Sequence, residues 1–264
     1  MHIARAFVAV CALLALVGAA DAADRKKLIV ATEGAYPPYN LVAPDGTLQG
    51  FDVDFAKVLC EKINADCTIV KQDWDGMIPA LMAKKFDLIV ASMGILPERE
   101  EKIDFSIPYY QSPTGLVARK SAGIKAGADG FVDPPTLAGK KVGVQRATAY
   151  ETFARQKWPK VEVVVYDSSE SADLDMTAGR LDARFDDLIV LQKGLLKSDS
   201  AADYERVGKI WSEKDFGSKG EGIGIRKGEA DLKAAVDKAI LEMRADGSYK
   251  RINDRYFDFD IYGQ

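Results

Sequence analysis

The sequence predicts an α/β protein made of two lobes of similar build, each with a parallel-rich central sheet flanked by helices. Short apolar runs of strand length, beginning with L-I-V-A-T at 28–32, alternate with segments of helical periodicity. This alternation is typical of a parallel sheet. It stops in a stretch rich in glycine and proline at 121–135 and restarts at 140–144, which indicates a second unit built like the first.

Residues 1–22 are predicted to be a secretory signal peptide. The first five residues carry a positive charge, an apolar run follows at 6–17, and Ala20-Asp21-Ala22 is a small-x-small cleavage site. The run is too short to span a bilayer, and Cys11 lies inside it with apolar residues still to follow. The mature chain is therefore expected to be exported and soluble, without a lipid attached at Cys11.

Composition excludes several classes of function. The formal net charge is −4, and acids and bases are mixed along the chain, so no basic patch indicates a nucleic-acid partner. The one histidine, His2, belongs to the signal peptide, which excludes a catalytic histidine or a histidine-bound metal. No cofactor is expected. Cys60 and Cys67 remain after export, and an even count in an exported protein indicates a disulfide, worth about 2 kcal/mol for so short a loop.

The first elements follow the strand at 28–32. A turn-rich loop at 33–39 holds an acid and aromatic residues, and Asp45-Gly46 marks a β-turn. Asp52 or Asp54 is predicted to cap a helix. The apolar face of this helix is expected to contain Phe55, Val58, Leu59 and Ile63.

A second group of elements leads to a candidate anion site. After a strand at 67–70, a loop at 73–76 enters a helix, and the buried strand 87–91 follows. The helix is expected to turn Ile78, Leu81 and Met82 inward. The strand is predicted to end in the small-residue turn 92–94, where backbone N–H groups can face a ligand. Arg99 follows closely and suits a carboxylate; the alternative is an ordinary turn with a solvated arginine.

The second unit repeats the pattern. Strands are predicted at 140–144, 161–166, 181–185 and 204–211, with helices through Phe153 and over 173–179. A strand at 222–226 and an amphipathic helix at 229–245 follow, and Gly247 is expected to end that helix. The inward face of the helix is predicted to be Leu232, Val236, Ile240 and Met243, and a last helix is predicted to end at 256–257.

Ligand groups of unlike chemistry occur at the carboxyl ends of three predicted strands. In an open α/β sheet, ligands bind at these ends. Arg99 suits a carboxylate, Asp187 an ammonium group and Glu33 a second cation. Tyr36 and Trp74 offer aromatic faces to an aliphatic or cationic stem. This set matches an α-amino acid with a basic side chain.

Longer stretches carry a resemblance to a known family. They are A-T-E-G-A-Y-P-P-Y, L-Q-G-F-D-V-D-F-A-K-V-L-C-E-K-I-N-A-D-C, W-D-G-M-I-P-A-L, G-K-K-V-G-V, D-M-T-A-G-R-L-D-A and D-G-S-Y-K-R-I-N-D-R-Y-F-D-F-D-I-Y-G. With them the chain resembles the periplasmic amino-acid-binding proteins of ABC transporters (solute-binding protein family 3). It is most similar to the lysine/arginine/ornithine-, histidine- and opine-binding group, over essentially the whole mature chain.

The resemblance implies the type II periplasmic-binding-protein fold, with two crossing hinge segments and the ligand in the cleft. The first lobe is then expected at 24–112 and 220–264, and the second at 113–219. The protein is expected to be a periplasmic monomer that binds an amino acid and delivers it to an inner-membrane ABC permease.

The resemblance also implies a role for each candidate residue. Glu33 meets a basic side chain, Tyr36 and Trp74 sandwich it, and Asp187 holds the α-amino group, with neighbouring Asp186 as the alternative. The α-carboxylate seat is formed by Ser92 and Arg99 with the Gly94 N–H group and Ala91 beside it, and Thr148 closes on it from the second lobe. Cys60 and Cys67 match the family's disulfide.

Departures from the family pattern bear on the side-chain end of the pocket. Ala91 and Gly94 stand where basic-amino-acid binders usually have serines, and Ala149-Tyr150 replaces a Thr-Gln pair. A larger ligand such as an opine therefore remains an alternative. Arg146 would suit an acidic ligand, but alternation along the strand is expected to point either it or Gln145 away.

An enzyme is the rival class of function. Some relatives with this fold are periplasmic dehydratases acting on cyclohexadienyl acids. That chemistry needs a protonated acid beside the leaving group, and Glu33 would serve if its pKa were raised. The paired anions and the ammonium seat favour a binding protein.

Overall fold

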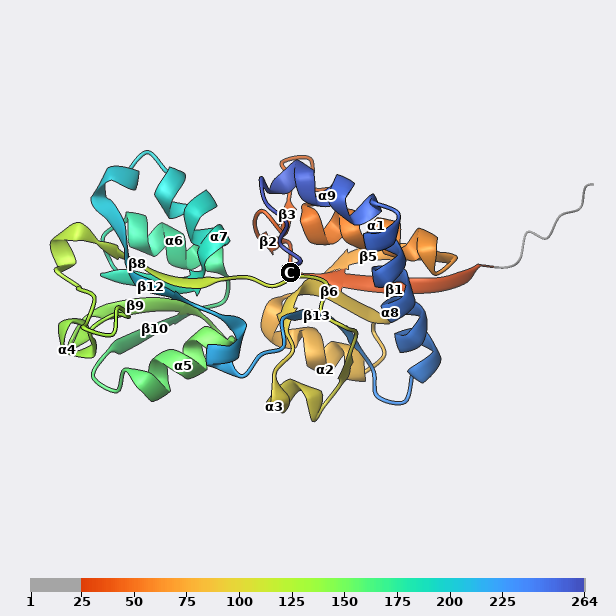
Figure 1. Cartoon of the computed structure of the whole chain (residues 1–264), viewed down its shortest axis with the longest axis horizontal. Coiled ribbons are helices and arrows are strands. Elements are labelled where there is room, and N and C mark those ends of the chain that lie inside the picture. The colour runs from red at the N-terminus through yellow and green to blue at the C-terminus, as the bar shows by residue number, and fades with distance from the viewer. Residues whose placement is uncertain (1–24, 264) are drawn as a thin grey trace, which may run out of the picture.

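Two five-stranded sheets form the centres of two lobes that lie side by side (Figure 1). The computed structural model describes residues 25–263. The predicted signal peptide lies outside the described residues. Within them, no helix is long and apolar enough to cross a membrane.

The first sheet has the strand order β5-β1-β6-β13-β7. Its strands are β1 (Lys26–Thr32), β5 (Ala65–Lys71), β6 (Leu88–Gly94), β7 (Asp104–Phe105) and β13 (Glu221–Ile225). Strand β1 is parallel to β5 and β6, as the alternation of strands and helices predicts, whereas β13 is antiparallel to both β6 and β7.

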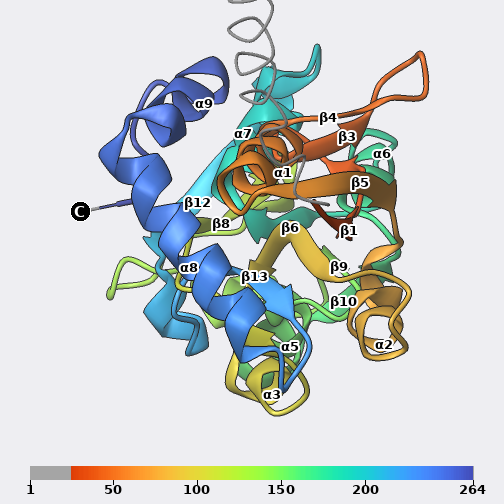
Figure 2. The same ribbon diagram turned by 90° about the vertical axis from the view of Figure 1, so that its right-hand side faces the viewer.

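Helices cover both faces of this sheet (Figure 2). The helices of this lobe are α1 (Phe51–Lys62), α2 (Met77–Met82), α3 (Pro97–Glu100), α8 (Ala230–Ala245) and α9 (Ser248–Tyr256). Alternate strand residues point to opposite faces of the sheet. Leu28 and Val30 of β1 pack with α1, α8 and α9, whereas Ala31 packs with α2. A small sheet of β2 (Ala35–Tyr36), β3 (Asn40–Val42) and β4 (Leu48–Gln49) lies beside these helices.

The second sheet has the strand order β10-β9-β11-β8-β12. Its strands are β8 (Thr114–Arg119), β9 (Lys141–Gln145), β10 (Glu162–Tyr166), β11 (Ala183–Asp187) and β12 (Tyr204–Trp211). Strand β9 is parallel to β10 and β11, and β8 is antiparallel to β11 and β12. The helices are α4 (Pro134–Leu137), α5 (Ala149–Lys157), α6 (Ser169–Thr177) and α7 (Leu188–Lys193).

Aromatic side chains fill much of both cores. Phe51, Phe55 and Tyr109 are fully buried in the first lobe, and Phe185 and Trp211 pack edge to face in the second. Short 3₁₀ turns complete the described fold: η1 (Trp74–Gly76), η2 (Lys120–Ala122), η3 (Leu195–Lys197), η4 (Ala201–Asp203) and η5 (Glu213–Phe216).

Two chain segments connect the lobes, from β7 to β8 and from β12 to β13 (Figure 1). They meet where Tyr110 pairs with Glu221, whose N–H donates to the Tyr110 carbonyl at 3.0 Å. Strand β13 of the first sheet therefore follows all strands of the second sheet in the sequence. This places β13 beside the junction between the lobes.

The predicted cap of the first long helix is wrong. Helix α1 begins at Phe51 with Gly50 as its N-cap, so Asp52 lies inside the helix. The Asp52 carboxylate is buried and accepts hydrogen bonds from Tyr109 Oη (2.7 Å), Asn40 Nδ2 (2.8 Å) and Ser92 Oγ (2.9 Å). Burial raises the pKa of Asp52 to about 6, and these hydrogen bonds oppose the rise.

Two further expectations differ from the structure. The small residues after Ala91 continue β6 to Gly94, because β13 pairs with this end of the strand; Gly94 faces Glu221 in the register. The Ser92 backbone has φ 56°, and the register shifts between Gly222 and Gly224. In α2, Met82 is 55% exposed instead of facing inward.

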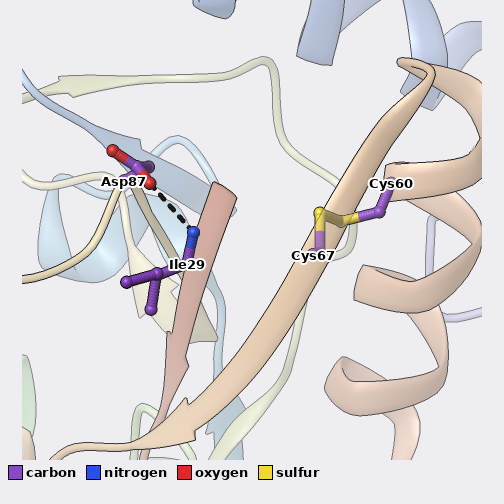
Figure 3. The surroundings of a disulfide bond; sticks show 4 residues. All are labelled: Ile29, Cys60, Cys67 and Asp87. Carbon is purple, nitrogen blue, oxygen red and sulfur yellow. Dashed lines mark hydrogen bonds between the residues drawn. A yellow bond between two sulfur atoms is a disulfide. The ribbon is translucent and has the colours of Figure 1, made fainter. Parts of the chain in front are cut away.

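A disulfide joins Cys60 in α1 to Cys67 in β5, as expected (Figure 3).

Asp87, just before β6, links strand β1 to the residue that follows β13. Its carboxylate accepts a hydrogen bond from Ile29 N at 2.9 Å (Figure 3) and pairs with Arg226 at 2.8 Å.

Candidate ligand-binding site

A cavity lies between the lobes and is lined by residues of both. Every residue predicted to bind the ligand, with the exception of Asp187, lines it: Glu33, Tyr36, Trp74, Ala91, Ser92, Gly94, Arg99 and Thr148. They come together because the carboxyl ends of β1, β6 and β9 face the same junction.

Glu33 follows β1 directly and is only 3% exposed. Its Oε1 accepts a hydrogen bond from Gln145 Nε2, at the end of β9 in the other lobe, at 2.6 Å. Burial raises the pKa of Glu33 to about 8; the Gln145 hydrogen bond opposes this rise, and the Asp186 carboxylate adds to it. A cation brought into the cavity would favour the ionised carboxylate.

Arg99 lies in α3 with its side chain in the cavity. Its Nη1 donates to the Gly94 carbonyl at 2.9 Å and its Nη2 to the Ala147 carbonyl, in the second lobe, at 3.1 Å. The guanidinium lies 5.2 Å from the centre of the Trp74 ring. Burial lowers the pKa of Arg99, but an arginine remains charged in proteins. Its planar fork and remaining N–H groups suit a carboxylate.

The two aromatic residues are held by hydrogen bonds across the junction. Trp74 Nε1 donates to the Ala147 carbonyl at 3.4 Å, and Tyr36 Oη donates to Asp186 Oδ1 at 2.7 Å. Asp186 is in turn paired with the fully buried Arg184 at 2.8 Å. Both rings are thereby fixed at the cavity wall.

Ser92 and Thr148 line the cavity but already have partners. Ser92 Oγ donates to Asp52, and its N–H donates to Tyr109 Oη at 3.0 Å. Thr148 is the N-cap of α5: its Oγ1 accepts from Glu151 N at 3.3 Å and donates to the Gln145 carbonyl at 2.7 Å. The structure therefore gives both residues a local structural role at the cavity wall.

The structure does not bring Asp187 to the cavity. Its Oδ1 caps α7 by accepting from Ile189 N (2.6 Å) and Val190 N (3.0 Å), and its Oδ2 accepts from Ser112 Oγ and from Tyr39 Oη (3.2 Å). Burial raises the pKa of Asp187 to about 7. The alternative, Asp186, is also absent from the cavity lining.

Strand alternation separates Gln145 from Arg146, as predicted. Gln145 lines the cavity, whereas Arg146 points outward and pairs with Asp167 at 2.8 Å. Arg146 therefore adds no positive charge to the cavity. Ala149 and Tyr150, where the sequence departs from the family pattern, both line it.

Several lining residues were not found from the sequence. They are Leu96, Thr114, Glu213, Phe216, Ser218 and Glu221. Most belong to the second connection between the lobes and to the start of β13. An acid between glycines in an apolar strand, as in K-G-E-G-I-G-I at 219–225, was the available signal for Glu221.

Comparisons with known proteins agree with this architecture. The model of the bacterial extracellular solute-binding proteins, family 3, matches residues 28–259. The L-arginine-binding protein of Pseudomonas aeruginosa is 41% identical over 92% of both chains. The histidine-binding periplasmic protein of Salmonella typhimurium is 39% identical over 93% of both.

A solved structure gives the same result. The periplasmic binding protein of Salmonella typhimurium studied for its high arginine specificity is 32% identical, with a TM-score of 0.78 over 88% of this chain and 99% of that one. These relatives are binding proteins, not enzymes, which favours binding over the dehydratase alternative. The chain belongs to the bacterial extracellular solute-binding proteins, family 3.

Proposed function

We propose that this protein captures a basic L-amino acid in the periplasm and delivers it to an inner-membrane ABC permease. The observation that carries the proposal is one cavity lined by both a buried arginine, Arg99, and a buried glutamate, Glu33. A basic amino acid carries a carboxylate and a cationic side chain, which are the complements of these two groups. The relatives named for binding arginine and histidine support the same class of ligand.

Most of the predicted residues have a part in this proposal, whereas Asp187 does not line the cavity. Arg99 takes the carboxylate of the amino acid, beside the backbone of Ser92 and Gly94. Glu33 ionises when it meets the cationic side chain, and Tyr36 and Trp74 flank the aliphatic stem. The residues of α5 close the cavity from the second lobe.

The proposed working unit is a monomer with two lobes that close on the ligand. The first lobe comprises 24–112 and 220–264, and the second 113–219. A ligand that contacts both lobes favours the closed form through its differential contacts, and the closed form is the one that the permease would receive.

An opine fits this cavity less well. Octopine carries two carboxylates and nopaline three, whereas Arg99 is the one basic side chain among the cavity-lining residues in the described part of the chain. A second carboxylate would lie among glutamates without a cation. A single-carboxylate ligand is therefore proposed.

A thermal-shift panel on ligand-free mature protein tests the function. Arginine, lysine, ornithine and histidine are compared with octopine, nopaline, glutamine and glutamate. A ligand at 100 times its dissociation constant stabilises a protein by about 2.7 kcal/mol, which gives a measurable rise in melting temperature. Shifts confined to the basic amino acids are expected. Shifts with glutamate or glutamine alone would contradict the assignment of Glu33.

A further inference from the structure

Glu221 puts a second buried carboxylate into the cavity, beyond the one that the proposed function uses. It is only 5% exposed and lines the cavity, and its Oε2 has no hydrogen-bond partner among residues 25–263. A buried charged oxygen without a partner is costly. Burial and then the neighbouring Glu213 carboxylate raise the pKa of Glu221 well above its usual range, and Arg99 opposes this rise.

The carboxylate of Glu221 and the guanidinium of Arg99 converge above Gly94. A Cβ atom placed on Gly94 would lie 3.3 Å from Glu221 Oε2, 3.6 Å from Arg99 Nη1 and 3.6 Å from Ser218 Oγ. Glycine at this position leaves that space to a ligand. An anion and a cation next to each other match an α-amino acid, which bears its ammonium and carboxylate groups on one carbon.

We propose, on the basis of the proposed function, that Glu221 holds the α-ammonium group of the amino acid whose carboxylate is held by Arg99. Ser218 Oγ, on the connection between the lobes, completes this zwitterion seat. The two oxygens of Asp187 already accept hydrogen bonds from Tyr39, Ser112 and the first turn of α7, whereas Glu221 Oε2 accepts none among residues 25–263.

The two charged groups of the seat lie within one lobe. Glu221 is the first residue of β13 and stands opposite Gly94 of β6 in the same sheet, and Arg99 follows β6 closely. The relative positions of the three residues are therefore fixed by strand pairing, whether or not the second lobe is closed. The α-amino acid end of the ligand binds the first lobe, and the second lobe then closes over it.

The test compares L-arginine with 5-guanidinopentanoate, which is arginine without its α-amino group. Titration calorimetry measures both ligands on the wild-type protein and on Glu221→Gln. A hydrogen bond to a charged group is worth about 1.5–3 kcal/mol, or roughly 10- to 150-fold in affinity. Glu221→Gln is expected to weaken L-arginine by a factor in that range and to leave 5-guanidinopentanoate nearly unchanged.

Glu98→Gln is the matched control, because it removes an exposed acid whose charge acts on Arg99 from outside the cavity. It is expected to reduce the affinity for L-arginine much less than Glu221→Gln does. Equal losses for the two ligands in Glu221→Gln, or equal losses of arginine affinity in the two variants, would overturn the role of Glu221. If the wild-type protein binds none of arginine, lysine, ornithine or histidine, the proposed function itself is wrong.

A crystal structure of the wild-type protein with L-arginine provides a test that needs no variant. The ammonium nitrogen is expected within about 3 Å of a Glu221 carboxylate oxygen. An ammonium group bound instead by Asp187 or Asp186 would overturn the proposal while leaving the function standing.

Discussion

At the scale of single residues, Glu33 is expected to decide the preference for a cationic side chain. Glu33→Gln keeps the shape and the buried position but removes the charge. The affinity for L-arginine is expected to fall by about 10- to 150-fold, because a charged hydrogen bond of about 1.5–3 kcal/mol becomes neutral. Titration calorimetry with arginine and glutamine measures the change, and the affinity for glutamine should fall little.

Glu170→Gln is the matched control for this variant. Glu170 is exposed, and its charge acts on Glu33 through space. Removing it changes the charge near the cavity without changing a cavity-lining group. A loss of arginine affinity as large as that of Glu33→Gln would mean that Glu33 contributes only to the negative electrostatic potential of the cavity and makes no direct contact with the ligand.

Arg184 is expected to be the most sensitive structural residue near the site. It is fully buried and pairs with Asp173 and Asp186, both at 2.8 Å. Arg184→Met leaves these acids without their cation, and breaking a buried pair from one side costs about 3–5 kcal/mol. Urea denaturation should show this fall in the free energy of unfolding.

Arg180→Met provides the comparison for Arg184. Arg180 pairs with Asp175 at the surface, where water replaces the lost contact. Its free energy of unfolding should stay near that of the wild-type protein. Similar free energies of unfolding for the two variants would show that the buried ion pairs of Arg184 contribute no more to stability than a surface pair does.

Residues were predictable from the sequence where a strand end fixes their position. Glu33 and Arg99 follow buried strands, so the rule for parallel sheets predicts their meeting. Glu221 was missed because it reaches the cavity only through the antiparallel pairing of β13 with β6, which local pattern does not reveal. Asp187 could either cap a helix or face a ligand, and only the packing of α7 shows that its oxygens are already used.

At the scale of elements, the disulfide is expected to stabilise the α1–β5 unit without affecting binding. Cys60 and Cys67 are seven residues apart, and neither lines the cavity. Closing so short a loop contributes about 2 kcal/mol. Urea denaturation with and without reductant should show a loss of that size, with arginine affinity unchanged.

A Cys60→Ala/Cys67→Ala double variant is the control for the reductant. Its free energy of unfolding should match that of the reduced wild-type protein and should not respond to reductant. A loss of arginine affinity on reduction would instead mean that the disulfide helps to position the cavity wall.

Periodicity predicted most elements, because each strand or helix has an apolar face set by its own residues. Periodicity failed where a residue far away in the sequence determines the local structure. Strand β6 extends to Gly94 only because β13 supplies hydrogen bonds there. Asp52 lies inside α1 as a buried acceptor because Asn40, Ser92 and Tyr109 bring three donors to it.

At the scale of the whole molecule, the junction between the lobes combines polar and apolar contacts. Hydrogen bonds cross it from Gln145 to Glu33 and from Tyr36 to Asp186, and Ile189 and Val190 of α7 pack with the core of the first lobe. Contacts of this kind between two lobes allow the lobes to move relative to each other. The junction also contains Glu33 and Asp187, whose pKa values are raised.

Those acids predict how stability depends on pH. The pKa of Glu33 is raised from 4.5 to about 8 and that of Asp187 from 3.8 to about 7 in the folded protein. Between the unfolded and folded pKa values the folded state binds more protons, so the free energy of unfolding contributed by these groups falls as pH rises. The melting temperature of ligand-free protein is therefore expected to fall between pH 5 and 8.

A cationic ligand should reverse part of that loss, because it favours the ionised form of Glu33. The rise in melting temperature produced by L-arginine is thus expected to be larger at pH 8 than at pH 5.5. Scanning calorimetry with and without ligand measures both trends, and Glu33→Gln should reduce the pH dependence of the ligand effect. If the arginine-induced rise shrinks as pH increases, Glu33 does not ionise on binding, and the cation must be held by another group in the cavity.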